Sequence, residues 1–210
     1  MAATNMNMIT KSSRGLQPIR VEDKLYTENR LIYLNTEINN ASAAAVNMQL
    51  LALDSVNHEE IRLIINSPGG EVSSGLSIYD TIRNVINSPV TAVCAGDAAS
   101  MAFIIFLAAD KRLMLQNSRL MLHDPAMGGG SLAGIKPLEL KTDILDRLLK
   151  VRDQIGNIIS KRSGLALDEV FAMTEKDTYL SAAEALEKGF ATGVIDSPAD
   201  IAQIGRASCR

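Results

Sequence analysis

The sequence is poor in the residues that crosslink small secreted domains and in those that stack on nucleic-acid bases. Its 210 residues include 2 Cys, 4 Phe, 4 Tyr and no Trp. Two cysteines cannot form a disulfide framework, and so few aromatic rings cannot form base-stacking platforms. The net charge is -3, whereas a nucleic-acid-binding domain needs a basic face. These absences exclude a disulfide-rich secreted domain and a nucleic-acid-binding protein.

Long hydrophobic runs are also missing. The longest candidate, 98–109, is interrupted by Ser100 and is shorter than the roughly 18 apolar residues of a membrane span. The N-terminus has no charged start followed by an apolar stretch, so we expect no signal peptide and a cytoplasmic location. The two histidines, His58 and His123, are too few for a histidine-rich metal site, and we expect no bound metal.

The composition that remains is typical of a globular domain, with 47% hydrophobic and 21% charged residues. The length favours one domain, which we place at 21–203 behind a polar, irregular and mobile arm at 1–20. Residues 204–210 resemble a translated sequencing adapter, so we expect a non-native tail and a missing natural C-terminus. Cys94 lies in an apolar run and is expected to be a buried, reduced thiol.

Apolar strands alternate with amphipathic helices along the chain. Alternation of this kind predicts an α/β fold with right-handed crossovers and a mostly parallel sheet covered by helices. The predicted strands are 30–34, 61–66, 90–94, 113–115, 119–122 and 193–195, and the predicted helices are 40–55, 73–86, 100–109, 137–162 and 182–188.

The longest of these helices carries one apolar stripe that needs a partner. Pro137 suits its first position and Gly164 suits the residue after its end. The stripe consists of Ile144, Leu148, Val151, Ile155 and Ile158.

Two strands are followed directly by small residues. Gly69 and Gly70 form either a tight turn or half of an oxyanion hole, and they lack the Lys and Ser/Thr of a phosphate loop. Ser100 follows Ala98 and Ala99 at a predicted helix start. It is either an N-cap or a nucleophile beside the positive end of the helix dipole.

His123 at a strand end and Asp177 in a loop would each be structural if taken alone. Together with Ser100 they complete a Ser–His–Asp set on an α/β scaffold, the set used in acyl transfer. From about Ser13 to Asp196 the chain resembles the proteolytic subunits of the ATP-dependent Clp protease, the ClpP family. The motifs that carry this resemblance are Ile65-Asn66-Ser67-Pro68-Gly69-Gly70, Ser77-Ile78-Tyr79-Asp80-Thr81, Gly96-Asp97-Ala98-Ala99-Ser100-Met101, Asn117-Ser118-Arg119-Leu120-Met121-Leu122-His123 and Asp177-Thr178-Tyr179-Leu180-Ser181-Ala182. Ser12-Ser13-Arg14-Gly15 also looks like the N-terminal arm of that family.

The resemblance implies a ClpP/crotonase-like superhelix of repeated β-β-α units with a protruding helical handle at about 124–163. It implies a serine endopeptidase that forms an acyl-enzyme. Ser100 matches the nucleophile, His123 the general base and Asp177 the carboxylate that orients the imidazole.

The same resemblance implies the binding positions. Gly70 and Met101 match the two residues whose backbone N–H groups form the oxyanion hole, and Val72 and Ala126 match the edges that bind substrate backbone. Strand addition at those edges favours extended, unfolded polypeptides.

The implied assembly is two stacked seven-membered rings, 14 subunits in all, that work with an AAA+ unfoldase of the Clp family. ATP would bind that partner, and this chain would need no cofactor. The handle helix would join the rings, and neither nucleic acid nor membrane would be a partner.

Several positions depart from the family pattern. Asp97 and Asp124 replace uncharged residues, and they are expected to oppose the oxyanion and to raise the pKa of His123, respectively. Glu175 and Lys176 stand where the family has an acid–Arg pair. The segments 127–137 and 189–196 are longer than expected.

Three alternatives stay open. The chain is a catalytically silent ring subunit that pairs with an active paralogue, an acyl-CoA-processing relative on the same crossover fold, or a phage-type head-maturation protease. The complete Ser–His–Asp set argues against the first two, and the N-terminal arm argues against the third.

Overall fold

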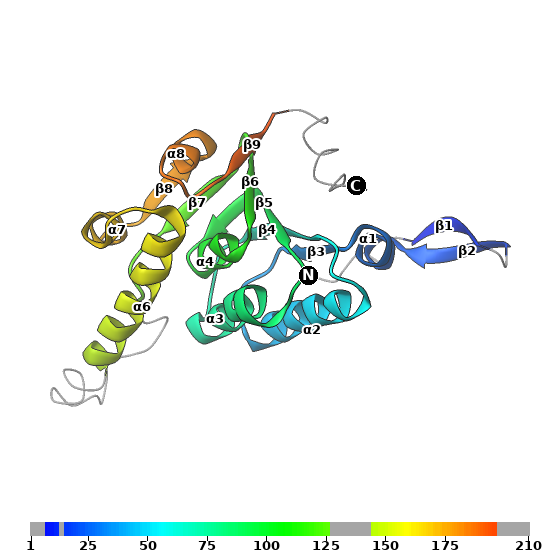
Figure 1. Cartoon of the computed structure of the whole chain (residues 1–210), viewed down its shortest axis with the longest axis horizontal. Helices are drawn as coiled ribbons and strands as arrows, with labels where there is room; N and C mark the ends of the chain where they lie inside the picture. Colours follow the sequence, from blue (N-terminus) through cyan, green and yellow to red (C-terminus); the bar gives the residue numbers. More distant parts are fainter. Residues whose placement is uncertain (1–6, 13–14, 127–143, 197–210) are drawn as a thin grey trace.

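A mostly parallel sheet with helices packed on it forms the centre of the structure, as predicted (Figure 1). The structure is a computed structural model that describes residues 7–12, 15–126 and 144–196. Within these ranges the strand order is β3-β4-β5-β6-β9, and β7 pairs with both β5 and β8. Every pairing in this sheet is parallel except that of β7 with β8.

The described elements follow one another in this order: β1 (Asn7–Ser12), β2 (Gly15–Arg20), α1 (Val21–Asn29), β3 (Leu31–Leu34), α2 (Asn40–Val56), β4 (Ile61–Ser67), α3 (Val72–Asp80), the π-helix η1 (Thr81–Val85), β5 (Val90–Ala99), α4 (Met101–Ala108), β6 (Lys111–Leu115), β7 (Arg119–Leu122), α6 (Asp146–Ser163), α7 (Leu167–Thr174), β8 (Thr178–Ser181), α8 (Ala182–Glu187) and β9 (Gly193–Ile195). None of the helices in these ranges is long and apolar enough to cross a membrane.

Helix α4 is the centre of the core. Every one of its side chains from Met101 to Ala108 is buried, because the helix is apolar on all sides. Phe103 meets Phe190 edge to face, with ring centroids 5.2 Å apart. Arg162 of α6 donates to the carbonyls of Leu107 and Ala109, each at 2.7 Å, so the buried end of α4 has hydrogen-bond partners.

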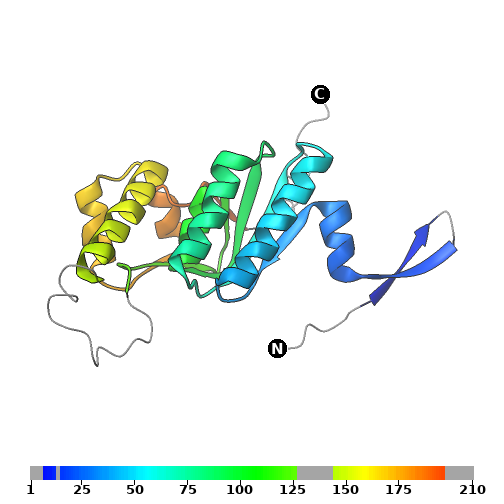
Figure 2. The same cartoon turned by 90° about the horizontal axis from the view of Figure 1, so that it is seen from below.

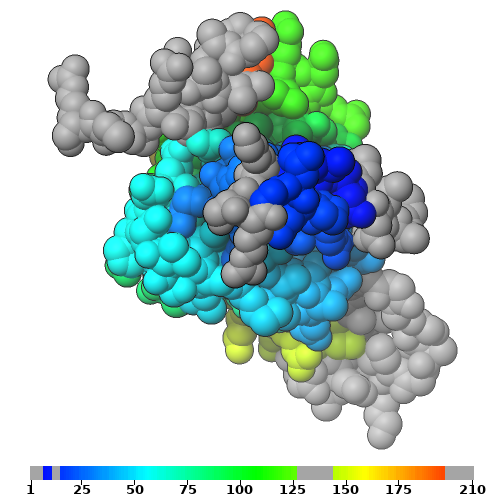
Figure 3. All heavy atoms as spheres, turned by 90° about the vertical axis from the view of Figure 1, so that its right-hand side faces the viewer, coloured from blue at the N-terminus to red at the C-terminus, as the bar shows by residue number. Residues whose placement is uncertain are grey.

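The arm at the N-terminus differs from its prediction. Residues 7–12 and 15–20 form an antiparallel hairpin, so the expectation of irregular structure was wrong there. Gly15, with φ of 97°, lies at its turn. The hairpin projects from one end of the molecule, opposite α6 and α7 (Figure 2), and faces the viewer when the molecule is seen from that end (Figure 3).

Other differences concern elements with weak patterns. Helix α1 was missed because none of its residues is buried, and α7 and β8 were missed because few of their residues are buried. Strand β5 continues to Ala99, five residues past its predicted end. The predicted helix start at Pro137, the longer segment 127–137 and the tail 204–210 lie outside the described residues.

The apolar stripe of α6 finds much of its partner within the same subunit. Ile155 is buried in the core, and Val151 and Ile158 pack against it. Leu145 and Leu149 are 48% and 46% exposed. In the described part of this segment, large apolar side chains are therefore left exposed only at Leu145, directly before α6, and at Leu149 in its first turn.

Asp54 near the end of α2 holds the chain that leads into β5. Its Oδ1 accepts hydrogen bonds from the backbone N–H of Asn87, from the N–H and hydroxyl of Ser88, and from His58. Burial alone would raise the pKa of Asp54, but the hydrogen bonds from Ser88, His58 and Asn87 outweigh it and lower the pKa to about 2.

We expect Asp54→Asn to lower the free energy of unfolding by about 1 to 2 kcal/mol at pH 7. Because the folded pKa is depressed, the stabilisation is complete above the unfolded pKa near 4 and is lost as the pH falls towards 2. Urea unfolding of both proteins at pH 7, 4 and 2.5 measures this. The control is Asp153→Asn on the exposed side of α6, and an equal stability gap at all three pH values would contradict the prediction.

Candidate active site

Ser100 lies at a strained turn between the centre of the sheet and the centre of the core. It joins β5 to α4 with φ of 53° and ψ of -121°, and among the described residues only Arg30 is another non-glycine with positive φ. Such a conformation costs about 1 to 3 kcal/mol and persists only where the surroundings impose it. Here the Ser100 N–H donates to Met121 O at 2.8 Å, and the α4 residues that follow are buried. The hydroxyl does not cap α4, so it is available for chemistry.

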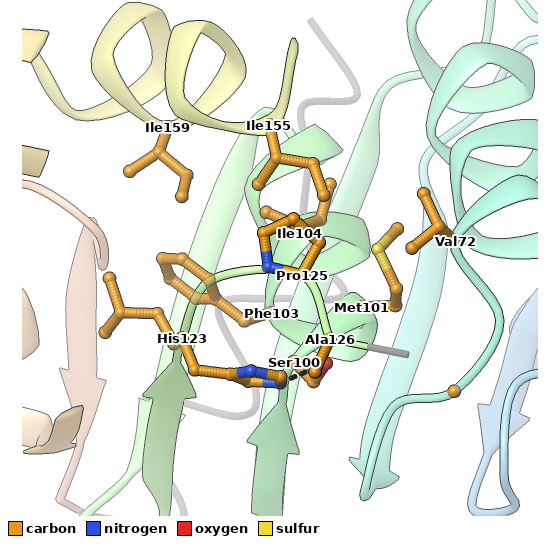
Figure 4. A pocket seen from close by; sticks show the side chains of 12 residues that line it. Val72, Ser100, Met101, Phe103, Ile104, His123, Pro125, Ala126, Ile155 and Ile159 are labelled. Atoms are coloured by element: carbon orange, nitrogen blue, oxygen red, sulfur yellow. Dashed lines mark hydrogen bonds between the residues drawn. The ribbon is translucent and has the colours of Figure 1, made fainter. Parts of the chain in front are cut away.

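His123 lies within hydrogen-bond distance of that hydroxyl. Its Nε2 is 2.9 Å from Ser100 Oγ, as the dashed line in Figure 4 shows. Strands β5 and β7 are parallel, with Ala99 opposite Met121, so the residues that follow them emerge at the same edge of the sheet. With Nε2 unprotonated, the imidazole can accept the serine proton, which is what a serine nucleophile requires.

Asp177 is next to this pair but does not bond to it. Strand β8 runs antiparallel to β7, with Leu122 opposite Thr178, so one further step of the register sets His123 opposite Asp177. The Asp177 side chain is exposed, and within the described residues no hydrogen bond joins it to His123. The structure thus brings together two of the three predicted catalytic residues and places the third beside them.

Gly69 and Gly70 fit where no side chain would. Their φ values are 90° and 150°. A Cβ on Gly69 would lie 2.5 Å from Ala99 O and 2.7 Å from Ser100 Cβ, and one on Gly70 would lie 2.1 Å from Ile38 O. The Ile38 N–H donates to Gly69 O at 2.8 Å, and the Glu71 N–H donates to Ile38 O at the same distance, so the turn is held on both sides.

This arrangement leaves two amides beside the hydroxyl. Gly70 and Met101 line the same pocket as Ser100, and in the described part of the chain neither backbone N–H donates to a protein acceptor. Met101 is the first residue of α4, where the helix dipole also favours an anion. Two such donors can stabilise a developing oxyanion.

The pocket beside Ser100 has a volume of about 240 Å³. Val72 and Ala126, the predicted substrate-binding residues, both line it (Figure 4). Its other side chains are mainly apolar and come from α4, β7 and α6: Phe103, Ile104, Leu122, Ile155 and Ile159. The pocket can therefore receive an apolar side chain next to the Ser100 hydroxyl.

Both unusual carboxylates near the site have arginine partners. Arg119 binds Asp97 through two hydrogen bonds, of 2.9 and 3.0 Å, and Arg152 Nε donates to Asp124 Oδ2 at 2.8 Å. The expected effects of Asp97 on the oxyanion and of Asp124 on His123 assumed unpaired carboxylates. In the structure each carboxylate has an arginine partner, which compensates its negative charge. Sequence reasoning did not find Arg152, since a single arginine on a charged helix gives no signal.

The remaining candidates stay outside the site. Cys94 is buried and free, and burial raises the pKa of its thiol, so it remains protonated at neutral pH. Glu175 and Lys176 follow α7 with exposed side chains. His58 pairs with Asp54, and the described residues contain no cluster of three or more His, Cys, Asp or Glu that could hold a metal ion.

Replacing Gly69 with alanine tests how closely this turn packs on the Ser100 turn. We expect at least a tenfold loss of Ser100 reactivity, because the added methyl would displace Ala99 and Ser100, and an oxyanion donor alone is worth ~100-fold or more. The rate of labelling by a fluorophosphonate probe measures this. Gly164→Ala is the matched control, since Gly164 also has positive φ but no atom lies within 4 Å of its added Cβ. Equal labelling of both variants would refute the close packing.

Comparison with known proteins agrees with this geometry. The family model described as Clp protease matches residues 13–198. The chain is 37% identical over 193 residues to the ATP-dependent Clp protease proteolytic subunit of Deinococcus radiodurans, covering 90% of this chain and 91% of the relative. It is also similar to the solved structure of a ClpP1 mutant from Listeria monocytogenes, with a TM-score of 0.74, 31% identity, and coverage of 85% of this chain and 98% of that chain.

Proposed function

This chain belongs to the Clp protease family as a proteolytic subunit, and we propose that Ser100, His123 and Asp177 carry its peptide-bond hydrolysis. The observation that carries the proposal is the 2.9 Å contact between Ser100 Oγ and His123 Nε2 at a strained turn. A serine at such a turn is arranged for acyl transfer when it lies beside a base and beside two backbone N–H groups that have no acceptor in the described part of the chain.

In the proposed reaction, Ser100 Oγ attacks the peptide carbonyl while its proton passes to His123 Nε2. The carbonyl oxygen becomes an oxyanion that accepts hydrogen bonds from the Gly70 and Met101 amides. His123 then gives the proton to the leaving amine, the C–N bond breaks, and an acyl-enzyme remains. Water attacks this ester with His123 again accepting a proton, and collapse returns the proton to Ser100. Asp177 contributes once its carboxylate turns to the Nδ1–H of His123.

We propose unfolded polypeptides as the substrates. The backbone next to Gly70 and Val72, and that at Ala126, would pair with an extended chain, while the apolar pocket takes the side chain before the cleaved bond. A folded protein cannot present such a strand. We therefore propose that an AAA+ unfoldase of the Clp family hydrolyses ATP to unfold the substrate. We also propose that this chain binds no cofactor.

We also propose that the chain works as a ring assembly of its own kind, two stacked seven-membered rings in the cytoplasm. The exposed Leu145, directly before α6, and Leu149 in its first turn support an interface between copies at the predicted handle. The catalytically silent subunit remains the competing proposal. Within the described residues, the missing hydrogen bond between Asp177 and His123 is the observation that favours it.

A fluorophosphonate probe separates the two proposals. We expect the assembled parent protein to be labelled at Ser100 and Ser100→Ala not to be labelled. His123→Ala should react about 100- to 10,000-fold more slowly, because the serine loses its base. Labelling is read by mass spectrometry, with assembly checked by light scattering. An assembled parent that resists the probe would establish the silent subunit.

Short fluorogenic peptides test the pocket. We expect cleavage without ATP after leucine or methionine to exceed cleavage after aspartate or lysine by at least tenfold in kcat/KM, because the pocket would leave a charge without a partner. Cleavage of a folded protein substrate should require the unfoldase and ATP. A preference for charged side chains at this position would overturn the assignment of the pocket.

A further inference from the structure

We propose that Asp124 and Arg152 are a positioning pair that holds His123 within reach of Ser100 and links the catalytic base to helix α6. The inference rests on the proposed function, because it assigns a role to residues that act through His123. Neither residue contacts Ser100 in the structure, so both would act only by placing the imidazole.

Asp124 is fixed on two sides directly after the base. Its backbone N–H donates to Thr174 O at 2.7 Å, and its carboxylate accepts from Arg152 Nε at 2.8 Å. Thr174 ends α7, whereas Arg152 belongs to α6. The residue that follows His123 is therefore tied to two helices that pack on each other.

Arg152 is itself held in place. Its guanidinium lies over the Phe171 ring of α7, 4.0 Å from the centroid, close enough for a cation–π contact. Gly156, one turn further along α6, allows this contact, since a Cβ there would come within 2.5 Å of the same ring. The Arg152 and Asp124 side chains are 25% and 34% exposed, so water screens the pair less than it screens a surface pair.

The Asp124–Arg152 pair is connected to elements that form other parts of the site. Ile155 and Ile159 lie one and two turns beyond Arg152 on α6 and line the pocket beside Ser100. Asp177 follows Thr174 by three residues, next to β8. A shift of α6 would therefore move Arg152, and through the bonds of Asp124 it would also move His123 and the end of α7.

A second Asp–Arg pair provides the matched control. Asp97 and Arg119 also lie near the site and make two hydrogen bonds, but their side chains are 47% and 59% exposed. They bridge β5 and β7, which the parallel ladder already joins. Removing this pair breaks no link to α6 or α7, so we expect it to have little effect on the base.

The experiment compares alanine variants of both pairs in the assembled, full-length protein. For Asp124→Ala and Arg152→Ala we expect roughly a tenfold fall in kcat on a short peptide, with KM within twofold, because a misplaced base slows chemistry more than binding. The double variant should be no slower than either single one, since both break the same link. Arg152→Lys keeps the charge and should recover at least a third of the parent kcat.

Asp97→Ala and the double variant Asp97→Ala/Arg119→Ala, neither of which leaves an unpaired carboxylate beside Ser100, should stay within twofold of the parent in kcat. Light scattering and urea unfolding confirm assembly and folding. If an alanine variant of the Asp124–Arg152 pair fails to assemble, Arg152→Gln tests the same link in its place. A parent that neither reacts with the probe nor cleaves peptide refutes the proposed function itself. Three results with an active parent would overturn only the positioning role. They are an unchanged kcat in the Asp124 and Arg152 variants, additive losses in the double variant, and equal losses in the control pair.

Discussion

The junction between β5 and α4 is the constraint on which the site depends. Ser100 adopts a conformation with positive φ because the β5 ladder, the bond from its N–H to Met121 O and the buried α4 leave it no other path. Burial of α4 supplies the energy, since each large apolar side chain taken out of water contributes about 1.5 to 3 kcal/mol. The core thus holds a strained serine with its hydroxyl directed away from the helix cap and towards His123.

Strand pairing then brings the other groups to this junction. The parallel pairing of β5 with β7 delivers His123, and the antiparallel pairing of β7 with β8 delivers Asp177 to the opposite position. Backbone register alone sets these Cα positions. It does not set the rotamer of Asp177, whose exposed carboxylate is free to remain in water. The fold therefore fixes two of the three proposed catalytic residues, whereas the third is only brought near.

Much of this was predictable from the sequence, and the rest was not for physical reasons. Buried parallel strands such as β4 are mostly apolar, so these strands and the Gly69–Gly70 turn could be recognised in the sequence. The roles of Ser100, His123 and Asp177 came from the resemblance as well as from their order. The α1 helix buries nothing and left no periodic pattern. Ion pairs such as Asp124–Arg152 join distant segments, which no local pattern reveals.

Those ion pairs explain how the site accommodates two unusual carboxylates. Asp97 and Asp124 lie near the proposed nucleophile and base, where an unpaired negative charge would disfavour an oxyanion. Each has an arginine on a neighbouring strand or helix, at 2.9 and 2.8 Å, so each brings a compensating positive charge with it. The two pairs differ in what they connect, because one lies along a ladder already formed and the other bridges separate layers. Equal compensation of charge therefore comes with unequal connection to α6, because only the Asp124–Arg152 pair reaches that helix.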